Sequence, residues 1–221
     1  MFLVEQFVYF NDDIFLNKPV KPEDFFKDGL PLDVGAINCI YFGKDSAGFF
    51  HAADLVIINS HFKKKQVMKR DWKKWYHPKN GYMNVTKNIL LHPWLWFPGF
   101  YNQHVSNNFL KSTFETVWAE EYETLHETCL HKFRKNGDVN QWVMKYWQLA
   151  DGKFNVRRGD FAFCYHVKNK NFRRLCEDLK EPQHSIVCIN DNARTDDFEE
   201  KKQTIVDIFE TKFPHKSSFE K

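Results

Sequence analysis

The order of apolar and polar residues predicts strands that alternate with helices. Residues Glu5 to Phe10 are β-branched and aromatic and predict a strand that ends at an acidic cluster. Two further strands are expected in "FAFCYHV" and "SIVCIND", separated by a helix in "NKNFRRLCEDL". A last helix is expected from about Asp197 to Lys212. Because strands alternate with helices, the pattern predicts an α/β fold.

Helical periodicity dominates the middle of the chain. It predicts two helices between His51 and His77, with a break near Ser60. Another apolar stripe runs from Leu110 to Trp118 at positions i, i+4, i+7 and i+8. We expect Asn107 or Asn108 to cap the helix that carries this stripe.

The clearest helical stripe lies in "DVNQWVMKYWQLADGKF". Asp138 is the expected N-cap of this helix, and Gly152 is its expected stop. The sequence has no internal repeat, low-complexity segment or linker-like composition. We therefore expect one domain over residues 1–221, with a mixed sheet flanked by helices.

Composition narrows the class of protein. Of the 221 residues, 43% are hydrophobic and 17% aromatic, which excludes a disordered chain. The net charge of +3, from 32 basic and 29 acidic residues, gives no case for a nucleic-acid partner. The odd number of cysteines, five, and the absence of a C-x-x-C pair indicate neither a disulfide framework nor a structural zinc site. With no signal peptide and no sufficiently long apolar span, we expect a cytoplasmic protein, with attachment to the inner face of the membrane as the alternative.

One stretch, "HFKKKQVMKRDWKKWYHPK", is strongly basic. Its interleaved apolar positions favour an amphipathic helix whose lysines, including Lys63, Lys64 and Lys65, are solvated at the surface. An anionic ligand and a membrane surface are the alternatives. The membrane alternative would also use the apolar "PWLWFPGF".

Two acidic clusters follow predicted strands. Asn11, Asp12 and Asp13 come after the first strand, and Asn190 and Asp191 come after the last. Ligands gather at the carboxyl ends of strands in open α/β sheets, and carboxylate and amide oxygens suit Mg²⁺ or Mn²⁺. Turns with no bound ion are the alternative at each place.

Three further residues are candidates for phosphate chemistry. His104 precedes a predicted helix that carries Lys111, so the pair could supply a base and a cation to one phosphate. Arg134 lies four residues before Asp138 and could bind phosphate through its planar fork. The alternatives are an ordinary surface or core histidine and an arginine that only pairs with the capping carboxylate.

Four blocks together resemble one known family. They occur in the order "YFNDDIFL", "NQHVSNNFLKSTFETVW", "HKFRKNGDVNQW" and "CINDN". The chain thereby resembles the Stealth family of hexose-1-phosphate transferases, in particular its bacterial capsular polysaccharide phosphotransferases. The likeness extends to "KNILLHPWLWFPGF", "KYWQLADGKF" and the tail "FPHKSSFE", and so covers nearly the whole chain.

The resemblance implies the transfer of hexose-1-phosphate from a nucleotide sugar to a sugar hydroxyl of a glycan acceptor. The product is a phosphodiester in a capsular polysaccharide or exopolysaccharide, and Mg²⁺ or Mn²⁺ is the implied cofactor. The implied metal ligands are Asp12, Asp13 and Asp191. The implied base is His104, the implied phosphate clamp is Lys111 with Arg134, and the implied supporting residues are Asn11, Asn190 and Asp138.

The resemblance also implies that two family blocks, which precede these in other members, are missing from the 221 residues. Those blocks are expected to supply part of the donor site and an acidic catalytic residue. The expected fold is accordingly an incomplete nucleotide-sugar transferase-like domain. An inactive remnant, a subunit that depends on a separate N-terminal half or on membrane-bound capsule machinery, and a peripheral membrane interaction module are the alternatives.

Overall fold

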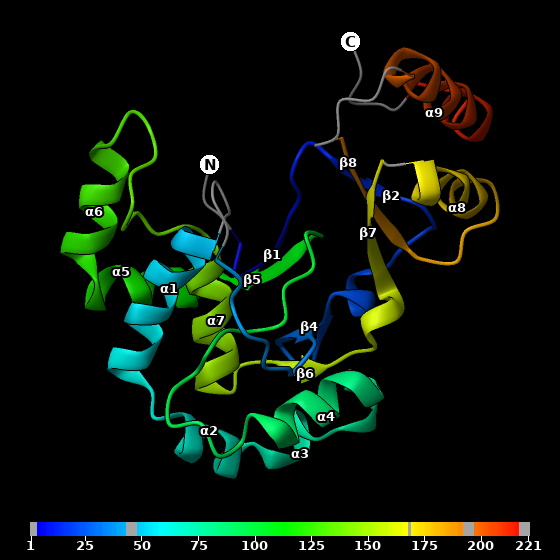
Figure 1. Cartoon of the computed structure of the whole chain (residues 1–221). Coiled ribbons are helices and arrows are strands. Elements are labelled where there is room, and N and C mark those ends of the chain that lie inside the picture. Colours follow the sequence, from blue (N-terminus) through cyan, green and yellow to red (C-terminus); the bar gives the residue numbers. More distant parts are fainter. Residues whose placement is uncertain (1–3, 43–47, 168, 192–196, 217–221) are drawn as a thin grey trace. The chain divides into compact units, whose positions relative to one another are not determined.

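The computed structural model describes residues 4–42, 48–167, 169–191 and 197–216, and the chain forms two compact units (Figure 1). The first unit consists of Met1–Tyr9, Lys21–Asn102 and Asn107–Gly159. The second consists of Phe10–Val20, Gln103–Ser106 and Asp160–Lys221. Each unit therefore joins stretches that are far apart in the sequence. The expectation of a single domain stays a prediction.

The first unit is mainly helical, with short strands. Its helices are α1 (Gly48–His61), α2 (Lys64–Arg70), α3 (Trp72–Trp75), α4 (Tyr82–Leu90), α5 (Lys111–Glu120), α6 (Tyr122–Leu130) and α7 (Trp142–Asp151), with short 3₁₀ turns at Pro22–Asp24 and Pro78–Asn80. Its strands are β1 (Gln6–Tyr9), β3 (Phe26–Lys27), β4 (Leu30–Asp33), β5 (Asn107–Leu110) and β6 (Asn155–Val156). β1 pairs antiparallel with β5, while β4 pairs antiparallel with β3 and parallel with β6.

Helix α7 is the centre of the first unit. Its residues from Trp142 to Ala150 are all buried, and it packs against α1, α5 and β5. The predicted apolar stripe is correct, but the opposite face is buried as well: the Lys145 Nζ lies 3.3 Å from Asp33 Oδ2. Gly152 ends the helix as predicted, in the left-handed conformation with φ of 78°. The positive φ is what favours glycine here; a Cβ would stand 2.6 Å from Asp71 Oδ2, the end of a side chain that can move.

Two expected helix caps are wrong. Asn107 and Asn108 belong to the buried strand β5, and α5 begins directly after it at Lys111. The Nδ2 of Asn108 donates hydrogen bonds to the carbonyls of Phe25 and Leu32, which explains why an amide is buried there. Asp138 does not cap α7, because that helix begins at Trp142.

The lysine-rich stretch also differs from the expectation. The predicted break near Ser60 is found at residues 62–63, but the second expected helix is divided into α2 and α3. Lys63 and Lys65 are exposed as predicted, but Lys64 is fully buried. Its Nζ donates hydrogen bonds to the carbonyls of Leu91, His92 and Trp94, which follow the end of α4. Burial lowers the pKa of Lys64 to about 8.

The second unit is a small α/β layer. Its elements are β2 (Ile14–Leu16), the 3₁₀ turn Gly159–Phe161 at its boundary, β7 (Ala162–His166), α8 (Asn169–Lys180), β8 (Ile186–Asn190) and α9 (Phe198–Lys212). In its described part, β8 lies between β2, which runs antiparallel, and β7, which runs parallel. Its buried core joins Tyr165 and Val187 of the sheet to Leu175 and Leu179 of α8 and Ile208 of α9.

The predicted α/β class is confirmed, with mixed sheets and flanking helices (Figure 1). The predicted strands at Glu5 to Phe10, "FAFCYHV" and "SIVCIND" are confirmed as β1, β7 and β8. The helix of "NKNFRRLCEDL" and the last helix are confirmed as α8 and α9. Among the described residues, no helix combines the length and the apolar character that a membrane crossing needs.

The buried ammonium of Lys64 generates a stability prediction. Lys64→Met removes the donor of three carbonyls, so we expect the free energy of unfolding to fall by about 2 kcal/mol. Lys65→Met is the matched control, since the neighbouring side chain is exposed and its replacement should change stability by less than about 0.5 kcal/mol. Urea unfolding followed by tryptophan fluorescence measures both. Equal stability of the two variants would contradict the structural role of Lys64.

Candidate functional site

The first acidic cluster forms a turn at the edge of the sheet in the second unit. β1 ends at Tyr9, and Asn11 to Asp13 lead into β2, with Ile14 N donating to the Asn11 carbonyl at 3.2 Å. Because β2 runs antiparallel to β8, the start of β2 lies beside the end of β8, and Ile189 N donates to the Asp13 carbonyl. The two acidic clusters therefore meet at one edge, and the first lies between two strands, after β1 and before β2.

His104 joins this edge from a distant part of the sequence. Its Nε2 lies 3.0 Å from Asp13 Oδ2 and 3.3 Å from Asn11 Nδ2. A carboxylate can only accept, so the tautomer that fits the shorter contact carries its proton on Nε2 and donates it to Asp13. In this tautomer Nδ1 is left with a free lone pair. Both side chains reach solvent: 44% of the His104 side chain and 25% of the Asp13 side chain are exposed.

Two cysteines stand next to Asp13. Cys188 of β8 is buried, and its Sγ donates to Asp13 Oδ2 at 3.3 Å. Cys164 is its direct register partner on β7, and the Cys164 Sγ donates to the Cys188 Sγ at 3.3 Å. The hydrogen bond with Cys164 and burial both raise the pKa of the Cys188 thiol. One oxygen of Asp13 thus faces a nitrogen and a sulfur.

A hollow of about 620 Å³ in the second unit collects the expected metal ligands. Its lining includes Asp12, Asp13, His104, Asn190 and Asp191. The other oxygen of Asp13, Oδ1, is buried and has no hydrogen-bond partner within the described part of the chain. Carboxylate and amide oxygens are the ligands that Mg²⁺ and Mn²⁺ prefer. Among the described residues, however, Asp12 and Asp191 do not join Asp13 in a group of ligand atoms within 4.8 Å of one another, so their binding of one ion stays a prediction.

The remaining predicted site residues belong to the first unit. Lys111 is the first residue of α5, and its Nζ lies 3.0 Å from Glu115 Oε1 in an exposed pair of the weak i, i+4 kind. The guanidinium of Arg134 lies over the ring of Phe50, with 5.4 Å to the centroid. Neither contact uses the whole hydrogen-bonding capacity of the cation. Their action together with His104 stays a prediction.

Asp138 has a structural role in the first unit. It accepts hydrogen bonds from Lys135 N and from the ring of His131, each at 2.7 Å. The backbone hydrogen bond from Lys135 lowers the pKa of Asp138, and the contact with His131 acts in the same direction. The carboxylate closes the turn at 135–138 instead of capping a helix. Its supporting role at a phosphate site stays a prediction.

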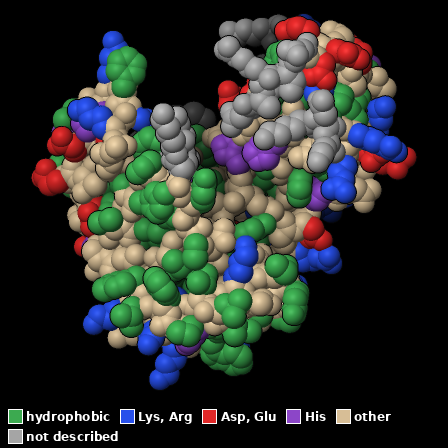
Figure 2. Space-filling view, viewed as in Figure 1, with side chains coloured by type: hydrophobic (Ala, Val, Ile, Leu, Met, Phe, Trp, Pro, Cys, Tyr) green, Lys and Arg blue, Asp and Glu red, His purple; other side chains and the backbone are tan. Residues whose placement is uncertain are grey.

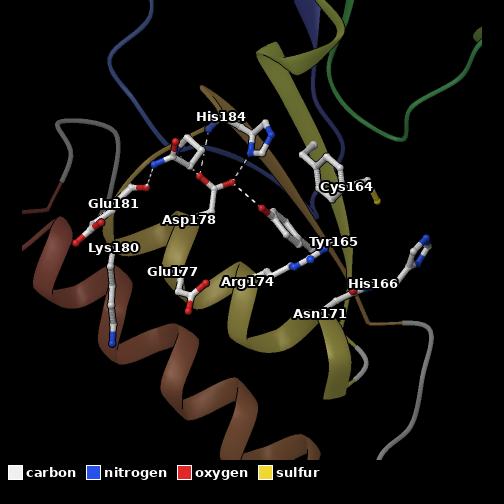
Figure 3. A pocket seen from close by; sticks show the side chains of 12 residues that line it. Cys164, Tyr165, His166, Asn171, Arg174, Glu177, Asp178, Lys180, Glu181 and His184 are labelled. Atoms are coloured by element: carbon white, nitrogen blue, oxygen red, sulfur yellow. Dashed lines mark hydrogen bonds and ion pairs between the residues drawn. The ribbon is translucent and has the colours of Figure 1, made fainter. Parts of the chain in front are cut away.

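A second hollow, of about 830 Å³, lies between β7 and α8 (Figure 3). Its centre is Asp178, which is 2% exposed and accepts hydrogen bonds from Tyr165 OH and the ring of His184. Burial alone would raise its pKa, but the hydrogen bonds from His184 and the backbone amide of Gln183 outweigh burial, so the pKa of Asp178 is lowered. The carboxylate also accepts hydrogen bonds from the backbone amides of Gln183 and His184, so it joins the strand to the loop after α8.

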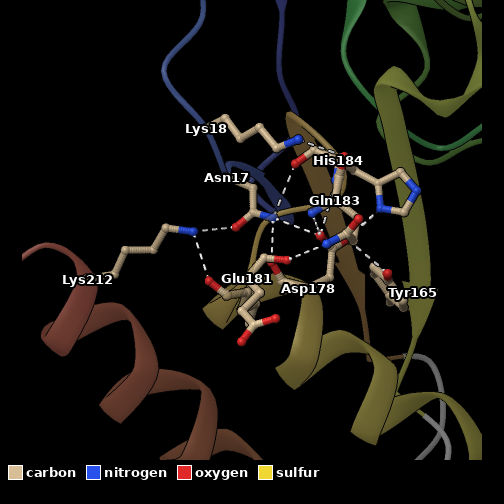
Figure 4. A network of polar contacts seen from close by, with 9 residues as sticks. Asn17, Lys18, Tyr165, Asp178, Glu181, Gln183, His184 and Lys212 are labelled. Atoms are coloured by element: carbon tan, nitrogen blue, oxygen red, sulfur yellow. Dashed lines mark hydrogen bonds and ion pairs between the residues drawn. The ribbon is translucent and has the colours of Figure 1, made fainter.

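The network around Asp178 ties distant segments together (Figure 4). Asn17, just after β2, donates from Nδ2 to the backbone carbonyl and side chain of Asp178. Lys212, at the end of α9, donates to Asn17 Oδ1 and to the carbonyl of Leu179. The network thereby holds β2 and α9 to α8, and β2 is the strand that carries Asp13 at its start.

Comparison with known proteins gives the family of the chain. The family model described as Stealth protein CR4, conserved region 4, matches residues 178–221. The chain is 39% identical to the capsular polysaccharide phosphotransferase WcwK of Streptococcus pneumoniae over 219 residues, 99% of this chain and 65% of that protein. The chain carries conserved region 4 of Stealth proteins and is of the Stealth type.

Two more relatives extend this match across bacteria. The exopolysaccharide phosphotransferase cps2G of Lactiplantibacillus plantarum is 36% identical over 223 residues, 99% of this Stealth chain and 64% of the relative. The receptor polysaccharide phosphotransferase WefC of Streptococcus gordonii is 35% identical, again over 99% of the chain and 65% of the relative. The chain thus spans about 65% of the length of the curated relatives that it matches most fully.

Sequence reasoning missed the cysteines of the Stealth chain. Cys164 and Cys188 lie 24 residues apart, and Cys188 is 175 residues from Asp13, so no short spacing marks them. A signal was present, because each cysteine lies near the middle of a predicted strand, in "FAFCYHV" and "SIVCIND". Pairing those strands in parallel and in that register would have placed the two thiols side by side.

The buried carboxylate of Asp178 generates a pH-dependent prediction. Asp178→Asn should lower the free energy of unfolding near pH 7 by about 3 kcal/mol, because charged hydrogen bonds are replaced by mismatched donors. Since the pKa of Asp178 in the folded chain lies below its ordinary value of 3.8, its contribution is present above that value. The contribution is lost as the pH falls through the folded value, so the gap between wild type and variant should narrow in acid.

Urea unfolding at neutral and at acidic pH measures both parts of this prediction. Glu177→Gln is the matched control: it removes a neighbouring carboxylate whose ion pair with Arg173 is exposed, and it should cost less than about 0.5 kcal/mol at either pH. A loss of stability in Glu177→Gln equal to that in Asp178→Asn would show that any negative charge on α8 suffices.

Proposed function

We propose that this chain carries part of the active site of a hexose-1-phosphate transferase that builds capsular polysaccharide or exopolysaccharide. In the proposed reaction, an acceptor sugar hydroxyl attacks the sugar-bearing phosphorus of a nucleotide sugar. A P–O bond to the acceptor forms, the P–O bond to the nucleoside monophosphate breaks, and the product is a phosphodiester. The observation that carries the proposal is the pairing of His104 with Asp13 beside Asp12 and Asp191 in one hollow.

His104 is the proposed base. Its Nε2–H donates to Asp13, which fixes the tautomer and the orientation of the ring, and its Nδ1 takes the proton of the attacking hydroxyl. Asp13 is then a positioning residue for the histidine as well as a candidate metal ligand. Asn11 Nδ2 lies 3.3 Å from the same Nε2, and because both atoms carry hydrogen in this tautomer, the contact is not a hydrogen bond and the ring is held by Asp13.

Cations stabilise the negative charge that develops on the phosphate oxygens. Lys111 and Arg134 are the proposed clamp, and the planar fork of Arg134 suits two phosphate oxygens at once. Asp12, Asp13 and Asp191 are the proposed ligands of Mg²⁺ or Mn²⁺, with Asn190 and Asn11 as neighbouring oxygens. Such an ion would supply charge neutralisation at the phosphates.

The relatives support the reaction class. Their names describe capsular, exopolysaccharide and receptor polysaccharide phosphotransferases, and the likeness runs through all four blocks that hold the proposed residues. Since the chain spans only part of those proteins, the proposal includes a requirement for the portion that the chain does not match. A partner-dependent subunit is one form of this proposal, and an inactive remnant is the competing outcome of the test.

The test measures the release of nucleoside monophosphate from nucleotide sugars with Mg²⁺ and capsule oligosaccharides as acceptors. Two forms are assayed: the chain as it is, and the chain joined to the unmatched part of its WcwK relative. In whichever form is active, His104→Ala should lower the rate about a hundredfold or more, the usual scale for a general base. His126→Ala is the matched control, because His126 is exposed on α6 of the first unit, and it should change the rate less than about threefold.

Each outcome of this assay decides between the alternatives. Turnover only in the joined form supports the partner-dependent subunit. No turnover in either form supports the inactive remnant and overturns the proposal. Near-normal turnover by His104→Ala would remove the histidine from the mechanism and leave the base to the unmatched part.

A second candidate function, attachment to a membrane surface, is favoured by one observation. Trp94, Leu95 and Trp96 are consecutive and expose 61%, 67% and 54% of their surface. Figure 2 shows hydrophobic side chains over the region of the first unit that holds α3 and α4, with lysine and arginine side chains beside them. Exposed tryptophans with nearby lysines are typical of surfaces that bind the interface of anionic bilayers.

Flotation with liposomes tests this second function. We expect the chain to bind vesicles that contain phosphatidylglycerol and not vesicles of phosphatidylcholine alone. Trp94→Ala with Trp96→Ala should lower the bound fraction at least about tenfold, because two interfacial aromatic side chains are lost. Phe133→Ala, which removes another exposed aromatic ring from the first unit, is the control and should leave binding unchanged. An equal loss of vesicle binding in both variants would overturn the proposal that Trp94 and Trp96 form a specific binding surface.

A further inference from the structure

The cluster at the start of β2 contains an uncommon set of metal-ligating atoms. One ligand atom each from Asp13, His104 and Cys188 can be chosen so that all three lie within 4.8 Å of one another. His104 Nε2 and Cys188 Sγ both contact the same oxygen, Asp13 Oδ2, at 3.0 and 3.3 Å. These three residues come from three separate segments of the sequence, so the cluster is a product of the fold.

The spacing suits a small tetrahedral ion. Zn²⁺ binds nitrogen and carboxylate oxygen at about 2.0–2.2 Å and thiolate at about 2.3 Å, which puts tetrahedral ligand atoms about 3.3–3.8 Å apart. The Nε2–Oδ2 contact of 3.0 Å and the Sγ–Oδ2 contact of 3.3 Å would have to open by a few tenths of an ångström. Small side-chain rotations supply such a shift, and the thiol proton that now bridges to Asp13 would leave when the ion enters.

The chemistry of the three ligands differs from that of the rest of the hollow. Mg²⁺ prefers oxygen ligands, which Asp12, Asp191 and the unpaired Oδ1 of Asp13 can offer. A thiol and an imidazole instead select softer or borderline ions, above all Zn²⁺. The ion can enter through the hollow that Asp13 and His104 line. The buried Cys188 and its neighbour Cys164 supply sulfur ligands on the inner side.

We propose that Asp13, His104 and Cys188 form a binding site for a thiophilic divalent ion, with Zn²⁺ as the ion that fits best. Three protein ligands leave the fourth position open to water or to a second thiolate, and Cys164 Sγ lies 3.3 Å from Cys188 Sγ. Coordination converts the Cys188 thiol into a thiolate and releases its proton to solvent. The site is distinct in chemistry from the oxygen-lined Mg²⁺ site, although both share Asp13.

Zinc binding also has a consequence for catalysis, and this part rests on the proposed function. An ion on Nε2 of His104 forces the ring proton onto Nδ1, the nitrogen proposed to accept the hydroxyl proton. A zinc-loaded site therefore has no free base, and the ion inhibits transfer. The binding experiment involves no turnover, so its outcome is independent of whether the proposed reaction is correct.

Cobalt substitution tests the site on the full chain. The protein is stripped of metal with a chelator under reducing conditions and titrated with Co²⁺, which reports coordination by its visible bands and thiolate ligation by a near-ultraviolet charge-transfer band. We expect one Co²⁺ per chain with a thiolate band, displaced by stoichiometric Zn²⁺ and not by a large excess of Mg²⁺. Cys188→Ser should abolish the thiolate band, and His104→Ala should weaken Co²⁺ binding at least about tenfold.

Matched controls separate the site from chance binding by surface residues. Cys129→Ser and His126→Ala remove an exposed cysteine and an exposed histidine of α6, and both should leave the titration unchanged. His104 is partly exposed, so His104→Ala stays informative if Cys188→Ser does not fold. A thiolate band that persists in folded Cys188→Ser, a titration that His104→Ala leaves unchanged, or the absence of any thiolate band in the wild type would overturn the proposal.

Discussion

The buried carboxylate of Asp178 is the interaction on which the second unit depends. Its two oxygens accept hydrogen bonds from a strand, from the loop after α8 and, through Asn17, from the segment after β2. A charge at this depth is tolerated because each of its oxygens has several donors, and the same saturation makes the carboxylate specific for one arrangement of its neighbours. The sheet edge that carries Asp13 is held in register with β8 as a result.

At that edge, the two carboxylate oxygens of Asp13 have different surroundings. Asp13 Oδ2 is occupied by a nitrogen and a sulfur, whereas Oδ1 is buried and unpaired among the described residues. Oxygen ligands from Asp12 and Asp191 lie around the same hollow. The difference between the two oxygens underlies the roles proposed for Asp13: Oδ2 contacts the histidine and the cysteine, whereas Oδ1 is left for a cation.

The first unit uses buried polar groups in another way. Lys64 donates to carbonyls beyond the end of α4, and Asn88 and Asn108 pair with the backbone of irregular segments. Such segments leave amides and carbonyls without a helical or strand partner, and each would be costly to bury unsatisfied. A lysine or asparagine in a polar stretch of sequence can therefore belong to the interior, where it replaces missing backbone hydrogen bonds.

The sequence by itself determined the strands β1, β7 and β8, the helices α8 and α9, the stop of α7 at Gly152, and the α/β class. These follow from local propensity and periodicity, which act over a few residues. It also indicated His104, Asp12, Asp13 and Asp191 as a set, through a family resemblance whose blocks keep their order. Asp138 and Asn107 were assigned to caps because their residue types favour caps, but tertiary hydrogen bonds with His131 and a buried strand pairing outweighed that preference.

Only the tertiary structure decided which of these residues meet. Asp13 and His104 are 91 residues apart, and Asp13 and Cys188 are 175 apart, so no local pattern relates them. The pairing of β2 with β8 sets the distance between Asp13 and Cys188, and strand register depends on the apolar core of the unit. His104 reaches Asp13 from a segment outside these strands. Burial is likewise a property of the folded chain. Lys63, Lys64 and Lys65 are chemically identical neighbours, yet Lys64 alone among them is buried, because its side chain points into the unit.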